Sequence, residues 1–269
     1  MRTIARKLVK ISVVSISAAA LSLMFVLGAP SESRADEADA KRLLKAMSDY
    51  MVSQKAISFG FDATLEIITK DNQKLALASS GAVNLNRPDK IHATRAGGHA
   101  DIEMLFDGTT LTLLGKNANL YTQIDVPGTI DNLVDVLREK YNLPLPAADL
   151  IMSNSYDELM ADVIDVKDLG SGVIDGVECD YLAFRKKEVD FQIWIAQGAS
   201  PYPCRYVITS KDIPLSPQYS IQIRDWQAGN DVAADDFGFN NSTNAKKVDL
   251  KDLKGMSALP DHFKKGDAQ

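Results

Sequence analysis

Residues 59–125 alternate apolar and polar side chains with period two, and this alternation constrains the fold more than any other feature of the chain. Phe59, Phe61 and Leu65 would face one way, whereas Asp62 and Thr64 would face the other. Because successive side chains of a β-strand point to opposite faces, the pattern predicts a broad antiparallel sheet with one apolar face. That face must either be covered by helices or hold an apolar molecule.

The first 35 residues have the features of a cleaved export signal. Basic side chains such as Arg2 and Lys7 precede an apolar run from residue 11 to 27, and Ser33-Arg34-Ala35 has the small-x-small pattern of a cleavage site. We expect cleavage after Ala35 and a periplasmic location. An uncleaved anchor helix is the alternative, because the apolar run is nearly long enough to span a bilayer. The chain has no cysteine near this site, which excludes a lipid-anchored lipoprotein.

Charge and length limit the class of protein. Residues 1–35 carry five basic side chains and one acidic one, so their removal takes the net charge from −6 to −10. Nucleic acids and anionic membrane surfaces attract basic patches, so an acidic chain of this kind is a poor partner for either. We expect a mature protein that does not span the membrane, with a single domain over residues 36–250 and a flexible tail over 251–269.

The pattern predicts one helix before the sheet, a long block of strands, two further helices and a second block of strands. We expect an α+β fold in which a large antiparallel sheet of about 11 strands curls into an incomplete β-barrel and is covered by a few helices. The expected helices are 38–51, 129–141 and 155–163, and the expected strands are 59–69, 74–86, 89–96, 100–107, 109–115, 119–125, 164–169, 172–187, 189–196, 203–213 and 217–226.

The two cysteines leave two alternatives open. Cys179 and Cys204 both follow the export signal, so they would lie in a compartment where disulfides form. In a simple meander they would flank the same central strand, about 9–10 Å apart, which exceeds the limit of about 7 Å between the Cα atoms of a disulfide. The loop 198–203 could displace Cys204 and close this gap. The pair is therefore either a disulfide or two buried thiols.

The sequence contains no recognisable catalytic or cofactor motif. A Gly-x-Ser-x-Gly elbow, a His-Glu-x-x-His helix and a glycine-rich phosphate loop are all missing. His92 and His99 flank the Gly97-Gly98 turn with Asp101 and Glu103 nearby, but a zinc site needs three or four converging ligands. Two surface histidines are the simpler interpretation. We therefore expect no enzyme activity, no cofactor and no metal site.

Several segments resemble proteins of the LolA/LolB type, which carry lipoproteins to the outer membrane. The order of Gly81, the Leu85-Asn86-Arg87-Pro88-Asp89 turn and the Asp107-Gly108-Thr109-Thr110-Leu111 hairpin is similar to that family's pattern. Residues 175–185, 189–195 and 203–209 more closely resemble an uncharacterised bacterial branch of predicted periplasmic proteins. The resemblance extends over about residues 38–250 and implies a half-barrel with an apolar cavity between the sheet and a helical lid.

The number of helices also favours a cavity. Helices of about fourteen residues are only some 20 Å long, which is too little to cover a curled sheet of this size. Our leading hypothesis is a non-enzymatic binding or carrier protein for a lipid, an acyl chain or another hydrophobic ligand. The alternative is an envelope structural or protein-interaction module whose core is filled by its own side chains. The expected lining residues are Phe61, Leu65, Leu77, Met104, Phe106, Leu133, Leu137, Ile193 and Ile221.

Overall fold

The computed structural model of the protein describes residues 37–143 and 145–253. Among these residues there are three α-helices: α1 (Glu37–Ser53), α2 (Ile130–Glu139) and α3 (Ser155–Met160). Short 3-10 helices are η1 (Lys116–Ala118), η2 (Ala148–Leu150), η3 (Gly229–Asp231) and η4 (Leu250–Asp252). The strands are β1 (Ala56–Ile68), β2 (Lys74–Asn86), β3 (Lys90–Gly97), β4 (Asp101–Phe106), β5 (Thr110–Gly115), β6 (Leu120–Asp125), β7 (Asp165–Ile174), β8 (Val177–Arg185), β9 (Val189–Ala196), β10 (Pro203–Ser210), β11 (Gln218–Ala228) and β12 (Lys246–Lys247).

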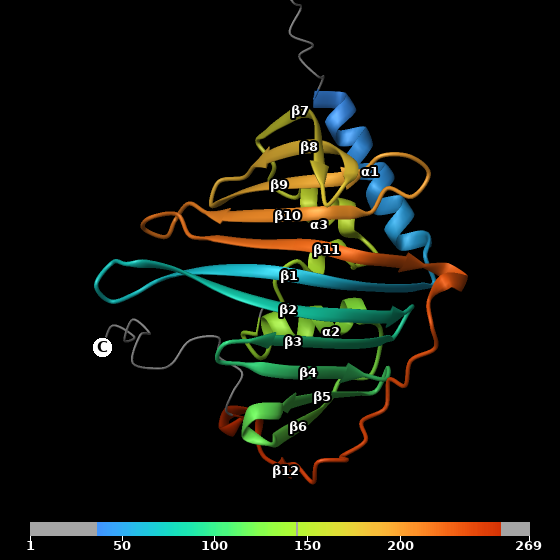
Figure 1. The fold of residues 1–269 in the computed structure, drawn as a ribbon, viewed down its shortest axis with the longest axis vertical. Coiled ribbons are helices and arrows are strands. Elements are labelled where there is room, and N and C mark those ends of the chain that lie inside the picture. Colours follow the sequence, from blue (N-terminus) through green and yellow to red (C-terminus); the bar gives the residue numbers. More distant parts are fainter. Residues whose placement is uncertain (1–36, 144, 254–269) are drawn as a thin grey trace, which may run out of the picture. The chain divides into compact units, whose positions relative to one another are not determined.

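All twelve strands belong to one open sheet in the order β12-β6-β5-β4-β3-β2-β1-β11-β10-β9-β8-β7 (Figure 1). Neighbouring strands are antiparallel, except that the two-residue β12 runs parallel to β6. The first and second blocks of strands join where β1 pairs with β11. The predicted fold class, a large open antiparallel sheet with a few helices, is confirmed. The predicted export signal and most of the predicted tail lie outside the described residues.

Helices α2 and α3 lie behind the strands as Figure 1 shows them, and α1 runs along the right-hand ends of the upper strands. All three contribute buried side chains to one hydrophobic cluster with the sheet. Buried side chains of α1 and α2 share one hydrophobic cluster with alternate residues of the strands. In α1 the apolar stripe consists of Ala40, Leu44, Met47 and Met51. Helix α2 begins where the Thr129 hydroxyl accepts a hydrogen bond from the Asn132 backbone N–H. No helix of the described chain is long and apolar enough to cross a bilayer.

One strand boundary differs from the prediction. The sequence suggested strands over 164–169 and 172–187, separated near Gly170, but β7 continues to Ile174 and the hairpin turn is Asp175-Gly176. Both turn residues have positive φ, 50° and 80°, as a tight two-residue hairpin requires. Gly170 instead lies in an irregularity between Asp168 and Ser171, where the register shifts. The glycine therefore marks a bulge and not the end of the strand.

Residues 229–253, here called the C-terminal strap, follow β11 and contain η3, β12 and η4. From β11 the strap crosses the face of the sheet away from the helices, where Asp235 accepts a hydrogen bond from Asn84. The Phe239 ring then packs against the Tyr121 ring at an angle of 39°, with ring centroids 4.8 Å apart, and β12 pairs with β6. Beyond β12 the strap reaches the helix side, where Leu253 joins the core. The strap therefore wraps around one edge of the sheet.

Candidate functional site

The nine side chains predicted to line a ligand cavity have two different surroundings. Leu65 and Leu77 are half-buried and lie in the wall of a small cavity. That any of the nine contacts a ligand stays a prediction. The other seven are buried together in the main hydrophobic cluster: Phe61, Met104, Phe106, Leu133, Leu137, Ile193 and Ile221.

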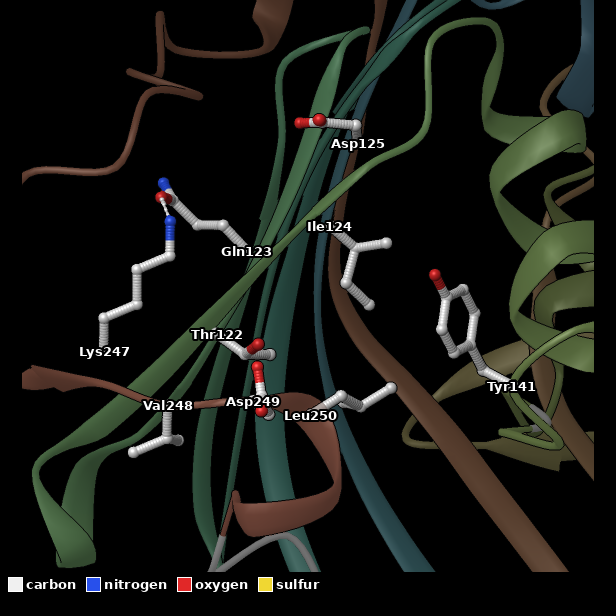
Figure 2. Close-up of a pocket in the computed structure, with 9 residues that line it drawn as sticks. All are labelled: Thr122, Gln123, Ile124, Asp125, Tyr141, Lys247, Val248, Asp249 and Leu250. Carbon is white, nitrogen blue, oxygen red and sulfur yellow. Dashed lines mark hydrogen bonds between the residues drawn. The ribbon is translucent and has the colours of Figure 1, made fainter.

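A cleft of about 850 Å³ lies between strand β6, the end of α2 and the C-terminal strap (Figure 2). We call it the edge cleft, because β6 is the last long strand at this side of the sheet. Its size falls within the range of about 300–1,000 Å³ that is usual for small-molecule sites. The lining residues are Thr122, Gln123, Ile124, Asp125, Tyr141, Lys247, Val248, Asp249 and Leu250.

The edge cleft has one apolar side and one polar side. Ile124, Tyr141 and Leu250 come from three separate elements and point toward the same space in Figure 2. All three also pack against the hydrophobic core. On the opposite side of β6, the Lys247 ammonium donates a hydrogen bond of 2.9 Å to the Gln123 side-chain oxygen. The cleft therefore offers an apolar surface that continues into the core, next to a hydrophilic rim.

A second cavity, of about 220 Å³, lies at the hairpin ends of β1, β2 and β3 and is here called the tip cavity. Leu65, Leu77 and Tyr219 contribute to its wall, and the β3–β4 loop at residues 97–100 borders it. Arg95 from β3 also lines the tip cavity. Leu65 pairs with both Leu77 and Tyr219 in the sheet register, so three neighbouring strands supply this apolar surface.

The polar groups of the tip cavity differ in charge from those of the edge cleft. Among the described residues that line it, Arg95 is the one with a formal charge, and His99 and Tyr219 are the other ionisable groups. Burial raises the pKa of Tyr219 to about 12, although the nearby Arg95 guanidinium acts in the opposite direction. The phenol is therefore a neutral hydrogen-bonding group at physiological pH. No carboxylate is among the described residues that line this cavity.

Two charged residues that the sequence analysis did not single out connect the helix layer to the sheet. Arg87 donates hydrogen bonds to the carbonyl oxygens of Met51, at 3.4 Å, and Ile151, at 2.8 Å. Asp149 accepts a hydrogen bond of 3.0 Å from the buried Tyr206 hydroxyl, and burial raises the pKa of this carboxyl group. Arg87 belongs to the Arg-Pro turn of the family resemblance, which was the available signal. Nothing in the pattern around Asp149 distinguishes it from a surface acid.

The cysteines are two buried free thiols, so the disulfide alternative is not what the structure contains. As predicted, Cys179 on β8 and Cys204 on β10 flank the same central strand β9. They form a small separate cluster with Ala196. Burial raises the pKa of both thiols, which disfavours the reactive thiolate.

His92 lies where the sequence suggested, close to Glu103, but its second partner comes from the strap. Its Nε2 is 2.8 Å from Glu103 and its Nδ1 is 3.0 Å from Asp235. These three side chains link β3, β4 and the strap on the face away from the helices. Within the described residues, no group of three or more His, Cys, Asp and Glu side chains could hold a metal ion.

Comparison with known proteins identifies one matching family. Residues 40–251 match a family described as "Predicted periplasmic protein (DUF2092)". No curated protein matches the chain in sequence.

The chain is similar to several solved structures, among them lipoprotein LppX from Mycobacterium tuberculosis, which is 13% identical with a TM-score of 0.39 over 74% of this chain and 100% of that one. LprF from Mycobacterium bovis is 11% identical, with a TM-score of 0.44 over 75% and 98% of the two chains. A LolA superfamily protein from Nitrosomonas europaea is 11% identical, with a TM-score of 0.31 over 72% and 94%.

Proposed function

This chain belongs to the DUF2092 family of predicted periplasmic proteins, and from that membership we propose that it is a non-enzymatic periplasmic protein that binds a hydrophobic ligand. The ligand is a lipid, an acyl chain or a similar apolar molecule. It lies on the helix-facing side of the sheet and enters at the edge cleft. The sequence prediction of a periplasmic location agrees with the description of the family, and the resemblance to an uncharacterised periplasmic branch is confirmed.

The observation that supports this proposal best is the convergence of Ile124, Tyr141 and Leu250 in the edge cleft. A strand, a helix end and the strap each supply one half-buried apolar side chain, and their surfaces continue into the main core. Exposed apolar surface of this kind is costly in water unless a partner covers it. An acyl chain that displaced water from the cleft would gain about 0.8 kcal/mol for each methylene that it buries.

The seven buried lining residues favour a particular mode of binding. Phe106, Leu133 and Ile193 are fully packed inside the cluster, so a long ligand cannot lie between the sheet and the helices as they stand. Such a ligand would either stay at the two cavities or separate the helices from the sheet. Arg87 and Asp149, which connect the helix layer to the sheet, would then be the contacts that change on loading.

An envelope structural or interaction module is the second candidate, and the same burial favours it. If the core is complete without a ligand, the cleft and the strap would serve a protein partner instead. A partner would then have to contact exposed surface around the edge cleft and not the interior. This candidate predicts an apoprotein that is fully stable and free of lipid.

Native mass spectrometry of the mature protein from its own periplasm, followed by lipid extraction, tests the proposal. Co-purified lipid at near one-to-one ratio would support the binding protein. An apoprotein that also ignores fluorescent fatty acids would contradict it and favour the interaction module.

A matched pair of variants assigns any binding to the edge cleft. Ile124→Asn removes the apolar side chain that points into the cleft, whereas Ile174→Asn makes the same change at a half-buried residue of β7 that lines neither cavity. We expect uptake of a fluorescent fatty acid to fall at least tenfold for Ile124→Asn and to remain unchanged for Ile174→Asn. Equal uptake by both variants would show that the ligand does not bind at the edge cleft.

A further inference from the structure

The tip cavity combines an apolar wall with a single positive charge. Leu65 and Leu77 face it from adjacent strands in direct register, and Tyr219 continues this surface on β11. Arg95 reaches the same space from β3. By the sheet register, the side chains of Leu65, Leu77, Tyr219 and Arg95 project toward the helix-facing side of the sheet, as those of the buried Phe61 and Leu85 do. The tip cavity is therefore an amphipathic site on the apolar face, at the end that the helices leave open.

The charge of this cavity is unusual for the protein. The whole chain carries 36 acidic against 30 basic side chains, yet no acid is among the described residues that line the tip cavity. The edge cleft, by contrast, is lined by Asp125 and Asp249 with only Lys247 to balance them. An anionic group would therefore lie near two carboxylates and one ammonium at the edge cleft, but near a guanidinium at the tip cavity.

We propose that the tip cavity binds the anionic head group of an amphiphile, with Arg95 and Tyr219 holding the head and Leu65 and Leu77 contacting the first part of the tail. This inference rests on the proposed function, because it specifies the chemistry of the hydrophobic ligand. A carboxylate or phosphate oxygen accepts charge-assisted hydrogen bonds from a guanidinium, and the neutral Tyr219 hydroxyl adds a further donor. A guanidinium has five N–H donors, so it can hold contacts within the protein and still bind a ligand.

The size of the cavity fits a head group and not a whole lipid. About 220 Å³ is smaller than the usual site for a drug-sized molecule, so the greater part of a tail must lie outside the cavity. The half-buried apolar residues next to it on the same strands, Ile67 and Leu75, offer a surface for that tail. Gly98, whose added Cβ would meet no atom within 4 Å, leaves the loop at the cavity rim open to an approaching molecule.

The test compares three probes with the same ten-carbon tail and different heads: decanoate, decanol and decyltrimethylammonium. Isothermal titration calorimetry on the mature protein should give an affinity for decanoate at least tenfold higher than for decanol, with the cationic probe weakest. Arg95→Gln should abolish the preference for decanoate, and Arg95→Lys should keep most of it. Arg205→Gln is the matched control, because Arg205 lies over the Trp194 ring and lines neither cavity.

A charge reversal provides a second test that does not depend on removing Arg95. Leu77→Asp adds a carboxylate to the half-exposed wall, so decanoate should lose at least tenfold in affinity while decyltrimethylammonium loses less. Decanol that binds wild-type protein as tightly as decanoate would overturn the inference and leave the proposed function intact. Failure of all three probes to bind would contradict both.

Discussion

The two ends of the apolar face of strand β1 have the same pattern of amino acids but different surroundings. Ile57, Phe59 and Phe61 are at most 7% exposed beneath the helices, whereas Leu65 and Ile67 on the same face are half-buried and lie beyond them. Alternation therefore determines which face a side chain occupies but not whether that face is covered. The difference separates residues that hold the fold together from residues that are available for a ligand.

Element length accounts for this difference. A strand of 13 residues such as β1 extends over about 43 Å at 3.3 Å per residue. The longest helix, α1, has 17 residues and extends over about 25 Å, and α2 is shorter still. Three helices of this size can cover one part of the helix-facing side but not the hairpin ends. We refer to these parts as the covered end and the open end.

Two leucines of strand β2 test whether the covered end and the open end differ in packing. Leu85 is 1% exposed at the covered end and Leu77 is half-buried at the open end, and both side chains project to the same face. Leu85→Ala should lower the free energy of unfolding by about 2–5 kcal/mol, whereas Leu77→Ala should cost about 1 kcal/mol or less. Urea denaturation measures both. Equal losses would mean that the open end is as tightly packed as the covered end.

Gly81 lies between these two leucines and marks where the packing changes. A Cβ atom at this position would lie 1.9 Å from the Thr94 carbonyl oxygen and 2.6 Å from the Phe61 ring. Gly81→Ala should therefore cost about 1–3 kcal/mol, because backbone and ring must both move. Gly98→Ala in the β3–β4 loop is the control and should leave the urea midpoint unchanged. A well-tolerated Gly81→Ala would show that the close approach of β3 is not required.

The helix layer over the covered end contains the buried carboxyl group of Asp149, which should lower the stability of the protein at neutral pH. Burial raises the pKa of Asp149, so its contribution to stability is fully present below the ordinary carboxyl pKa of about 4 and is lost as the pH rises through the raised value. Asp149→Asn should then gain about 1 kcal/mol at pH 8 and little at pH 4. Urea denaturation at the two pH values measures this. The same gain from the exposed Asp157→Asn would indicate a general charge effect.

The smallest effect is expected at the two thiols, which are covered as completely as the main core. Because burial raises the pKa of Cys179 and Cys204, native protein at pH 8 should take up no iodoacetamide, and denatured protein should take up two equivalents. Intact-mass spectrometry distinguishes these outcomes. Denatured protein that remains unmodified until a reductant is added would reveal a disulfide instead.

The sequence alone predicted most of the sheet, because side-chain alternation and turn residues are local signals. Strands β1 to β6 and helix α2 lie within a few residues of their predicted positions. The boundary between β7 and β8 was wrong because Gly170 and Asp175-Gly176 are both turn signals, and only the pairing with β8 distinguishes a bulge from a hairpin. Strand β12 was not predicted, because its two residues are too few to show an alternating pattern.

The candidate site was much less predictable, since it depends on contacts between distant segments. The sequence predicted Leu65 and Leu77, which line the tip cavity, but it could not separate them from Phe106, which is fully buried. Both are apolar residues on the apolar face of strands. The edge cleft was not predicted, because Ile124 and Leu250 meet only after the strap has wrapped around the sheet. No local sequence pattern specifies this contact between distant segments.

The strap also determines when the edge cleft can form during folding. Two walls of the edge cleft come from residues 122–125 and 141, but the third comes from 247–250, close to the end of the chain. Contacts between segments so far apart in sequence pay a large loop-closure entropy and tend to form late in folding. A chain released or cut before residue 246 would still contain most of the core residues but would lack this wall. Ligand binding at the edge cleft would therefore report that the strap has joined the sheet.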